Sequence, residues 1–309
     1  MSIAIIFNQK DPKHWEAALQ AHLPQALVEI YPNIKDKQSI EFVLCWKPEA
    51  DVLADFPNVK VIQSVGAAID HITKTQSIKE NQTICRIVDE NLSHDMFEFL
   101  LTTILVQLKN FPLYSQQKER KLWQPKTYKN IGDTHISILG IGQIGADVAK
   151  KLAKIGFKVK GWSGSKKEIT DVESYAGADE IDSCLKNTDV LINLLPVTKQ
   201  TENIINRNLL KKLNKGGFFI NVGRGEHLVE QDLMELLNTE HLSGALLDVF
   251  RAEPLPSEHP FWAHPKIQIT PHIASITNID SAVILVAENY KNFITGLPLK
   301  HTVSLTKGY

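Results

Sequence analysis

The sequence has little net charge, few cysteines and no long apolar run. Its 34 lysines and arginines nearly balance 35 aspartates and glutamates, so no excess of positive charge attracts nucleic acid or an anionic membrane surface. Three unevenly spaced cysteines, Cys45, Cys85 and Cys184, argue against disulfides and against a bound metal. The apolar run at residues 3–7 is too short for a signal peptide, and no run has membrane-spanning length. We therefore expect a cytoplasmic protein with a small-molecule partner, without nucleic acid or membrane.

A glycine-rich turn is the most informative motif. An apolar run at residues 134–139 leads into G-x-G-x-x-G, and residues 146–155 then have apolar side chains at helical spacing. In a dinucleotide site the first glycine permits a sharp turn, the second lets the backbone approach a pyrophosphate, and the third lets helix and strand pack closely. The predicted cofactor-binding residues here are Gly140, Gly142, Gln143, Ile144 and Gly145.

Short apolar runs alternate with helical patterns along the chain, which predicts parallel sheets. Strands are expected at residues 3–7, 42–46, 59–64, 84–88, 134–139, 157–162, 189–195, 217–222, 243–249 and 266–270. Helices are expected at residues 15–22, 93–108, 146–155, around 209–210, 232–237 and 277–295. Residues 109–130 are polar and basic, which indicates a solvated face, and residues 163–188 are acidic without a clear pattern. The tail at residues 297–309 is expected to be extended.

The order of these elements predicts an α/β protein with two lobes. One α/β unit precedes the dinucleotide domain, and the last helix most simply returns to that first unit. We expect Rossmann-like or flavodoxin-like lobes with parallel sheets. The substrate-binding domain is discontinuous and comprises residues 1–99 and 276–309, and residues 100–275 form the NAD(P)-binding Rossmann domain.

Three ionisable residues, Arg224, Glu253 and His272, follow expected strands of the second domain. Ligands of open α/β sheets bind beyond the carboxyl ends of strands, so the three can converge there. Each alone has an ordinary explanation, as a surface charge, a loop acid and a capping or core histidine. Together they have the chemistry to reduce a 2-oxo acid. An arginine fork holds the carboxylate, a histidine protonates the carbonyl oxygen, and a glutamate orients the histidine.

The same segments carry a family resemblance. NVGRG at residues 221–225, DVFRAEPLP at 248–256 and TPHIA at 270–274 resemble the D-isomer-specific 2-hydroxyacid dehydrogenase family. CWKP at residues 45–48, SVGAAIDHI at 64–72 and EPLPSEHPFWAHP at 253–265 resemble most its glyoxylate/hydroxypyruvate reductase branch. The resemblance covers most of the chain and is specific over the second half. It implies a catalytic set of Arg224 as substrate clamp, His272 as acid/base and Glu253 as its partner.

The resemblance also implies further ligand contacts. Trp46 would be a wall of the substrate pocket, and the amides of Gly66 and Ala67 would bind the substrate carboxylate. The residues near the nicotinamide half of the cofactor would be Pro196, Val222 and Asp248, and Leu195 and Gly223 beside them are also expected to bind the cofactor. The family implies an active-site cleft between the two lobes. It also implies a homodimer in which the helix and arm after about residue 93 reach the partner. From sequence alone, the aromatic-bearing segment at residues 111–123 is equally compatible with packing within one chain.

The end of the strand at residues 157–162 bears on the choice of cofactor. An NAD site has an acidic residue there for the ribose hydroxyls, but this chain has none before Glu168. The hydroxyls and ammonium groups that would bind a 2′-phosphate belong to Ser163, Ser165, Lys166 and Lys167. NADP-preferring reductases of this branch carry an arginine where this chain has Gly164. We therefore expect NADP, with NAD possible but weaker, and a preference smaller than in those relatives. A solvated basic turn is the alternative.

We expect NADPH-dependent reduction of a small 2-oxo acid, glyoxylate or hydroxypyruvate, to glycolate or D-glycerate, with His272 as proton donor. One alternative is a D-lactate-type or other dehydrogenase that acts on a bulkier oxo acid, which depends on pocket volume. An alternative of another class is a dinucleotide-sensing protein like the transcriptional corepressor relatives of the family. The complete set of arginine, glutamate and histidine favours catalysis.

Overall fold

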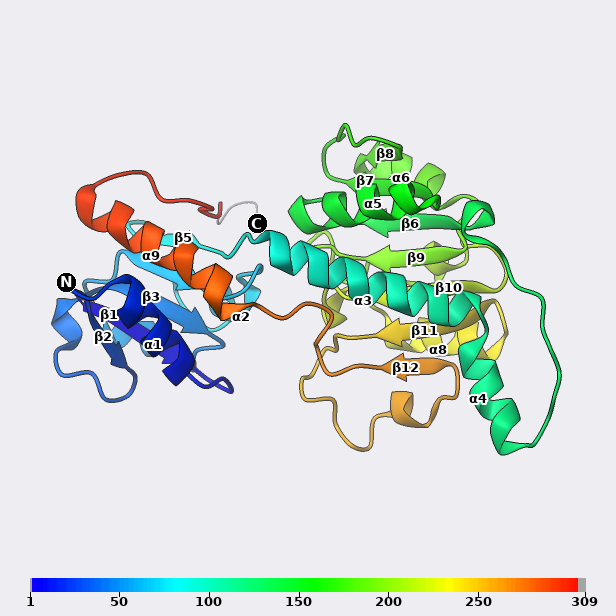
Figure 1. The fold of residues 1–309 in the computed structure, drawn as a ribbon, viewed down its shortest axis with the longest axis horizontal. Helices are drawn as coiled ribbons and strands as arrows, with labels where there is room; N and C mark the ends of the chain where they lie inside the picture. Colours follow the sequence, from blue (N-terminus) through cyan, green and yellow to red (C-terminus); the bar gives the residue numbers. More distant parts are fainter. Residues whose placement is uncertain (1, 305–309) are drawn as a thin grey trace. The chain divides into compact units, whose positions relative to one another are not determined.

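The computed structural model describes residues 2–304, and the chain forms two compact units (Figure 1). The first unit comprises the chain up to Leu92 and again from Thr277, and the second comprises Ser93–Ile276. Both are α/β and all their strand pairs are parallel, which confirms the predicted fold class. None of the helices among residues 2–304 combines the length and the apolar composition needed to cross a lipid bilayer.

The first unit has a five-stranded sheet in the order β2-β1-β3-β4-β5. Its strands are β1 (Ser2–Phe7), β2 (Leu27–Ile30), β3 (Ile40–Trp46), β4 (Val61–Ser64) and β5 (Thr83–Cys85). Its helices are α1 (Lys13–His22), α2 (Asp70–Thr73) and α9 (Ile279–Thr295), with 3-10 turns η1 (Lys37–Ser39) and η2 (Val52–Asp55). Helices α1 and α9 pack against one another. Trp15 of α1 is fully buried, and Tyr290 of α9 meets Phe42 of β3 edge-on with 5.5 Å between ring centroids. The last helix of the chain therefore completes the core of the first unit.

The second unit has a seven-stranded sheet in the order β12-β11-β10-β9-β6-β7-β8. Its strands are β6 (His135–Leu139), β7 (Lys158–Ser163), β8 (Val172–Ala176), β9 (Val190–Asn193), β10 (Gly217–Asn221), β11 (Leu242–Leu247) and β12 (Ile267–Ile269). Its helices are α3 (Glu90–Leu108), which begins just before the unit boundary, α4 (Phe111–Glu119), α5 (Gln143–Ile155), α6 (Gly177–Leu185), α7 (Arg207–Leu210) and α8 (Glu230–Asn238). Its 3-10 turns are η3 (Ile131–Asp133), η4 (Gly225–His227) and η5 (Pro260–Ala263).

Strand order reverses around β6. This strand is the first of the second unit, and it pairs with β7 on one side and with β9 on the other. A parallel sheet that changes direction in this way has a crevice at the carboxyl ends of the two neighbouring strands, and dinucleotides bind there. The turn after β6 is the one that carries the three glycines.

Several elements were missed or misplaced by the sequence patterns. Strand β8 lies at the sheet edge without one fully buried residue, and α6 buries only Cys184 and Leu185, so neither has a strong apolar pattern. Helix α4 buries only Gln117, which explains why its segment resembled a solvated loop. Strand β2 was not expected, because it is a short edge strand. Strand β5 ends at Cys85 rather than at residue 88. Residues 305–309 of the expected extended tail lie outside the described residues.

Candidate active site

The expected catalytic and cofactor residues of the second unit lie along one edge of its sheet. Because all seven strands are parallel, the loops that follow them lie at the same edge. From β12 across to β7, the residues on these loops are His272, then Asp248 and Glu253, then Val222, Gly223 and Arg224, then Leu195 and Pro196, then the glycine turn. Last come Ser163, which ends β7, and the loop residues Ser165, Lys166 and Lys167.

Each of the three glycines has a distinct structural surrounding. Gly140 has φ +101°, and a Cβ there would lie 2.6 Å from the carbonyl group of Leu194. A Cβ on Gly145 would lie 2.0 Å from the carbonyl oxygen of Gly140. A Cβ on Gly142 would meet no atom within 4 Å, and Gly142 directly precedes α5, whose first turn has no side-chain cap. The chain itself therefore excludes side chains at the first and third glycines. The space at the second is open beside a helix N-terminus, which suits a pyrophosphate.

The turn after β7 presents two ammonium groups. Lys166 and Lys167 are exposed and form no ion pair with any side chain of residues 2–304. The Ser163 hydroxyl donates a hydrogen bond to the Ser165 carbonyl oxygen at 2.7 Å. A Cβ on Gly164 would meet no atom within 4 Å. This turn can therefore accept an anion through its lysines, and the Ser163 hydroxyl would have to exchange its present acceptor to take part.

His272 and Glu253 form a hydrogen-bonded pair. The distance between His272 Nδ1 and Glu253 Oε2 is 2.8 Å, and Glu253 Oε1 accepts from the Phe250 amide at 3.2 Å. His272 has φ 55°, a left-handed conformation that few residues other than glycine adopt. Because a carboxylate only accepts, Nδ1 carries the hydrogen towards Glu253. Nε2 is then the ring nitrogen that remains to exchange a proton.

Asp248 holds the loop that carries His272. Its side chain is almost fully buried at 1% exposure, and its carboxylate accepts from Thr270 Oγ1 at 2.6 Å and from the amides of Ile273 and Ala274 at 2.8 and 3.0 Å. Its carbonyl oxygen accepts from the His272 amide at 2.9 Å. These four bonds surround His272 in sequence and stabilise its unusual backbone conformation. The carboxylate itself is directed into the loop.

The loop that carries Arg224 packs tightly on its neighbour. A Cβ on Gly225 would lie 2.0 Å from the Phe250 carbonyl carbon, so only glycine lets the loop after β10 contact the loop after β11. Arg224 Nη1 donates to the Gly223 carbonyl oxygen at 2.6 Å, and the Arg224 carbonyl oxygen accepts from Asn221 Nδ2 at 3.1 Å. The residue therefore has a fixed backbone at the carboxyl end of β10.

Arg251, which follows the same strand as Glu253, has a structural role. Its guanidinium donates to the Leu228 carbonyl oxygen at 2.7 Å and to the Glu226 carbonyl oxygen at 3.1 Å, and it also bonds Asn203. These contacts tie the loop after β11 to turn η4 and the segment that follows it.

Sequence reasoning also missed three fully buried polar residues behind this edge, Asn193, Asn221 and His227. The available signal was a polar residue at the end of each of two apolar strands.

In the first unit, the expected substrate residues lie at the carboxyl edge of that unit's sheet. Trp46 ends β3, and a Cβ on Gly66 would lie 2.8 Å from Trp46 Cζ3, so the loop after β4 touches the edge of the indole ring. The Gly66 amide donates to Ser64 Oγ at 3.1 Å. The Ala67 amide has no acceptor within the described part of the chain. Lys10 Nζ lies 4.9 Å from the centroid of the Trp46 ring. Of the two expected amide donors, Ala67 is therefore the one available to a ligand.

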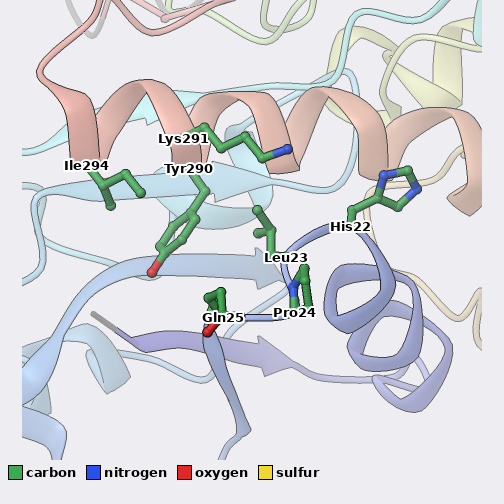
Figure 2. A pocket seen from close by; sticks show the side chains of 8 residues that line it. His22, Leu23, Pro24, Gln25, Tyr290, Lys291 and Ile294 are labelled. Atoms are coloured by element: carbon green, nitrogen blue, oxygen red, sulfur yellow. The ribbon is translucent and has the colours of Figure 1, made fainter.

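Two cavities within the units contain none of the expected site residues. One of about 530 Å³ in the first unit lies between the end of α1 with the loop after it and the side chains of Tyr290, Lys291 and Ile294 on α9 (Figure 2). One of about 360 Å³ in the second unit is lined by α3, β11, β12 and Thr270. Across residues 2–304, no cluster of three or more histidine, cysteine or acidic side chains is arranged to hold a metal ion.

Comparison with known proteins agrees with this architecture. The model of the family described as "D-isomer specific 2-hydroxyacid dehydrogenase, NAD binding domain" matches residues 101–274. Glyoxylate/hydroxypyruvate reductase A of Yersinia enterocolitica is 36% identical over 304 residues, which is 97% of each chain.

Two solved structures superpose over essentially the whole chain. The NADPH-dependent glyoxylate/hydroxypyruvate reductase of Sinorhizobium meliloti, in complex with NADP and sulfate, has a TM-score of 0.94 and 35% identity and covers 100% of both chains. A D-isomer-specific 2-hydroxyacid dehydrogenase of Xanthobacter autotrophicus Py2, in complex with NADPH and MES, has a TM-score of 0.95 and 30% identity, and covers 100% of this chain and 99% of its own.

Proposed function

This chain belongs to the D-isomer-specific 2-hydroxyacid dehydrogenase family, and we propose that it is an NADPH-dependent reductase of small 2-oxo acids. Its substrates are glyoxylate and hydroxypyruvate, and its products are glycolate and D-glycerate. The observation that carries the proposal is the 2.8 Å contact between His272 and Glu253 at the same sheet edge as Arg224 and the glycine turn. The reductases of Yersinia and Sinorhizobium described above support the choice of substrate class.

The cofactor is assigned to the second unit. The open space at Gly142 and the uncapped first turn of α5 fit a pyrophosphate, and Lys166 and Lys167 fit a 2′-phosphate. Leu195, Pro196, Val222 and Gly223 are assigned to the nicotinamide half, with Asp248 as the support of the neighbouring loop. When bound, NADPH supplies the hydride that the reaction needs. The NADP in the Sinorhizobium structure supports NADP over NAD, which we expect to act more weakly.

The substrate carboxylate is assigned to Arg224 and to the loop after β4. A guanidinium fork binds a planar carboxylate through two parallel hydrogen bonds. The Ala67 amide, with Gly66 beside it, supplies further hydrogen bonding, and Trp46 limits the size of the substituent on the oxo acid. We therefore propose a substrate-binding domain of residues 1–99 and 276–309, which carries Trp46, Gly66 and Ala67, and a cofactor-binding domain of residues 100–275, which also carries Arg224, with one boundary inside α3.

His272 is assigned as the proton donor. As negative charge develops on the carbonyl oxygen, a protonated imidazole donates its Nε2 proton to that oxygen. Glu253 holds the Nδ1–H, which keeps the ring in one orientation and stabilises its positive charge before transfer. Removal of the acid in this step typically costs about 10²–10⁴-fold in rate.

We further propose a cytoplasmic homodimer. Trp123 is 96% exposed and Phe111 is 60% exposed, and both belong to the arm that we expect to reach a partner. Large exposed aromatic side chains of this kind are typical of protein interfaces. Sedimentation equilibrium of the purified chain tests the homodimer. We expect the mass of two copies of the chain, and the mass of a single copy would contradict the proposal.

A substrate screen tests the proposed function. We expect glyoxylate and hydroxypyruvate to exceed pyruvate and phenylpyruvate in kcat/KM by at least tenfold, about 1.4 kcal/mol of transition-state binding. Preference for phenylpyruvate by the same factor would indicate a dehydrogenase for bulkier oxo acids. Tight NADP binding without turnover of any oxo acid would indicate a dinucleotide sensor.

A further inference from the structure

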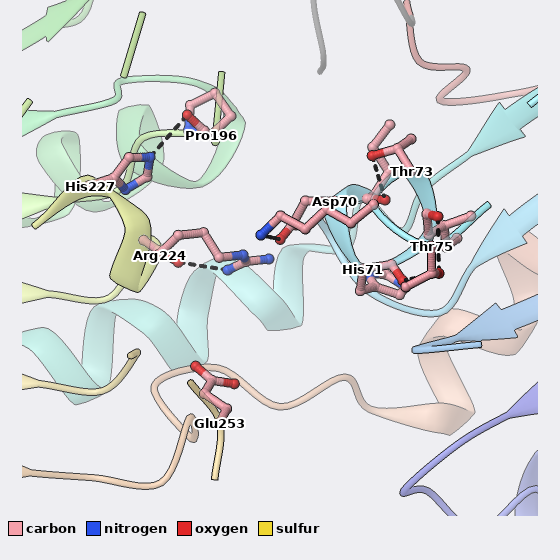
Figure 3. Close-up of polar contacts among 12 residues, drawn as sticks. Asp70, His71, Thr73, Thr75, Pro196, Arg224, His227 and Glu253 are labelled. Atoms are coloured by element: carbon pink, nitrogen blue, oxygen red, sulfur yellow. Dashed lines mark hydrogen bonds and ion pairs between the residues drawn. The ribbon is translucent and has the colours of Figure 1, made fainter. Parts of the chain in front are cut away.

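A buried network of three polar side chains joins the loops that follow β9 and β10. Asn193, Asn221 and His227 have 0% exposed surface. Asn193 Nδ2 donates to Asn221 Oδ1 at 2.9 Å and lies 2.8 Å from His227 Nδ1. Figure 3 shows the other ring nitrogen, Nε2, directed at the Pro196 carbonyl oxygen, 3.1 Å away.

Backbone groups at the ends of the network determine how each amide side chain is turned. A backbone N–H only donates, and a carbonyl oxygen only accepts. The Gly223 N–H donates to Asn221 Oδ1 at 3.3 Å, and the Arg224 carbonyl oxygen accepts from Asn221 Nδ2 at 3.1 Å. The Leu195 N–H donates to Asn193 Oδ1 at 3.3 Å. Each asparagine therefore has one orientation that satisfies its neighbours, and Asn193 Nδ2 is the atom that faces the histidine ring.

The same reasoning determines the tautomer of His227. Its Nε2 must carry a hydrogen, because the Pro196 carbonyl oxygen can only accept. Its Nδ1 must lack one, because Asn193 Nδ2 is a donor. The ring is therefore the neutral Nε2–H form. A second ring proton would set two donors against each other in a site without exposed surface, which is costly.

We propose that His227 is a positioning residue for hydride transfer, because it fastens Pro196 to the turn that begins at Arg224. This inference rests on the proposed function, in which Pro196 lies beside the nicotinamide and Arg224 holds the oxo acid. A Cβ on Gly223 would lie 2.9 Å from Asn193 Nδ2 and 3.2 Å from the Leu195 carbonyl oxygen, so the two loops are also in close contact at Gly223. Hydride transfer is sensitive to displacements on the order of 1 Å. His227 thus acts through the two loops without touching the reacting atoms.

Three substitutions separate this role from a contribution to folding alone. His227→Asn retains an oxygen that can accept from Asn193 and loses the bond to Pro196. His227→Gln retains a donor that can reach Pro196. His227→Phe fills the space and makes neither bond. The matched control is Thr201→Val, because Thr201 Oγ1 donates to the same Pro196 carbonyl oxygen at 2.7 Å but does not join the two loops.

Kinetics and thermal unfolding are measured together for the four variants. We expect His227→Phe to lower kcat for glyoxylate at saturating NADPH by about tenfold or more, with the Kd for NADP changed much less. His227→Gln should recover part of kcat, and Thr201→Val should lower Tm with a smaller effect on kcat. A fall in Tm for His227→Phe with kcat unchanged would contradict the positioning role.

Nitrogen NMR of histidine-labelled protein supplies a readout that does not depend on activity. Resonances of His227 are identified by their absence in His227→Asn. We expect a protonated Nε2 and an unprotonated Nδ1 near neutral pH, and an Nδ1–H or doubly protonated ring would overturn the inference. Absence of turnover in the unaltered protein would instead overturn the proposed function, and the NMR result would still decide whether His227 makes the connection described.

Discussion

His272 Nδ1 lies 2.8 Å from Glu253 Oε2, and both residues are held by loops that follow neighbouring strands. The other Glu253 oxygen accepts from the Phe250 amide, and Asp248 accepts from the Thr270 hydroxyl before His272, from the His272 amide and from the Ile273 amide after it. The pair is therefore positioned by backbone contacts rather than by side-chain rotamers alone. A histidine oriented in this way presents Nε2 consistently to a substrate, as an acid/base must.

Glu253→Gln tests the pair through its pH dependence. A neutral amide does not stabilise the imidazolium, so kcat/KM should fall little at low pH and roughly tenfold or more as the pH rises above the usual range of histidine. A pH–rate profile for glyoxylate measures this. A profile that matches the unaltered protein would show that the carboxylate has no part in proton transfer.

Arg224→Lys tests the substrate clamp. Lysine keeps the charge but not the planar fork, so KM for glyoxylate should rise about tenfold while kcat changes less. Arg251→Lys is the control, because Arg251 bonds the carbonyl oxygens of Glu226 and Leu228 and should lower Tm without raising KM. Equal KM effects in both variants would contradict the assignment of the clamp to Arg224.

The glycine turn allows a separation of binding from folding. Gly142→Ala puts a methyl group into open space, so we expect an unchanged Tm and a rise of about tenfold or more in the Kd for NADP. Gly145→Ala puts a methyl group 2.0 Å from the Gly140 carbonyl oxygen, so we expect a loss of about 1–3 kcal/mol of stability. Titration with NADP and thermal unfolding distinguish them, and undiminished NADP binding by Gly142→Ala would exclude a pyrophosphate there.

Gly164→Arg tests the cofactor preference. The position has no neighbouring atom within 4 Å of a Cβ, so an arginine fits without displacing the chain. A guanidinium adds a bidentate contact to a 2′-phosphate, and KM for NADPH should therefore fall more than KM for NADH. Measurement at low ionic strength keeps the phosphate contact least screened. Equal changes in KM for NADPH and NADH would show that the 2′-phosphate does not bind at this turn.

The three thiols should be inert in the folded protein. Burial raises the pKa of Cys45, Cys85 and Cys184 to about 12 in each case. Because the thiolate is the reactive form, a disulfide reagent near neutral pH should label none of them in the native state and all three in denaturant. Rapid labelling of any one in the native protein would contradict their burial.

The sequence was sufficient to predict the parallel sheets and to predict that the candidate site residues follow the carboxyl ends of their strands. Central strands such as β10 are buried at every residue, so they form continuous apolar runs that end where a polar loop begins. Arg224 was recognisable because it follows such a run, and His272 because it follows the shorter apolar run of the half-buried edge strand β12. The family resemblance then connected them to a known chemistry.

The remaining features depend on contacts that a linear pattern does not contain. Strand β8 and helix α4 have too few buried side chains to leave a periodic signal. Asp248 and His227 are polar residues whose hydrogen-bond partners lie many residues away in the sequence. Asp248 bonds the Ala274 amide, and His227 bonds the Pro196 carbonyl oxygen. Their roles follow from which backbone groups the fold brings to them, and these become visible only in three dimensions.

The central claim is that this chain reduces a small 2-oxo acid with NADPH and with His272 as the acid. The most direct measurement follows the absorbance of NADPH after glyoxylate is added to the unaltered protein and, separately, to the His272→Asn variant. The affinity of each protein for NADP is measured alongside. We predict rapid NADPH consumption by the unaltered protein, a loss of about 10²–10⁴-fold in the variant, and similar NADP affinity in both. Near-normal kcat in His272→Asn, or no consumption by the unaltered protein despite NADP binding, would contradict the account.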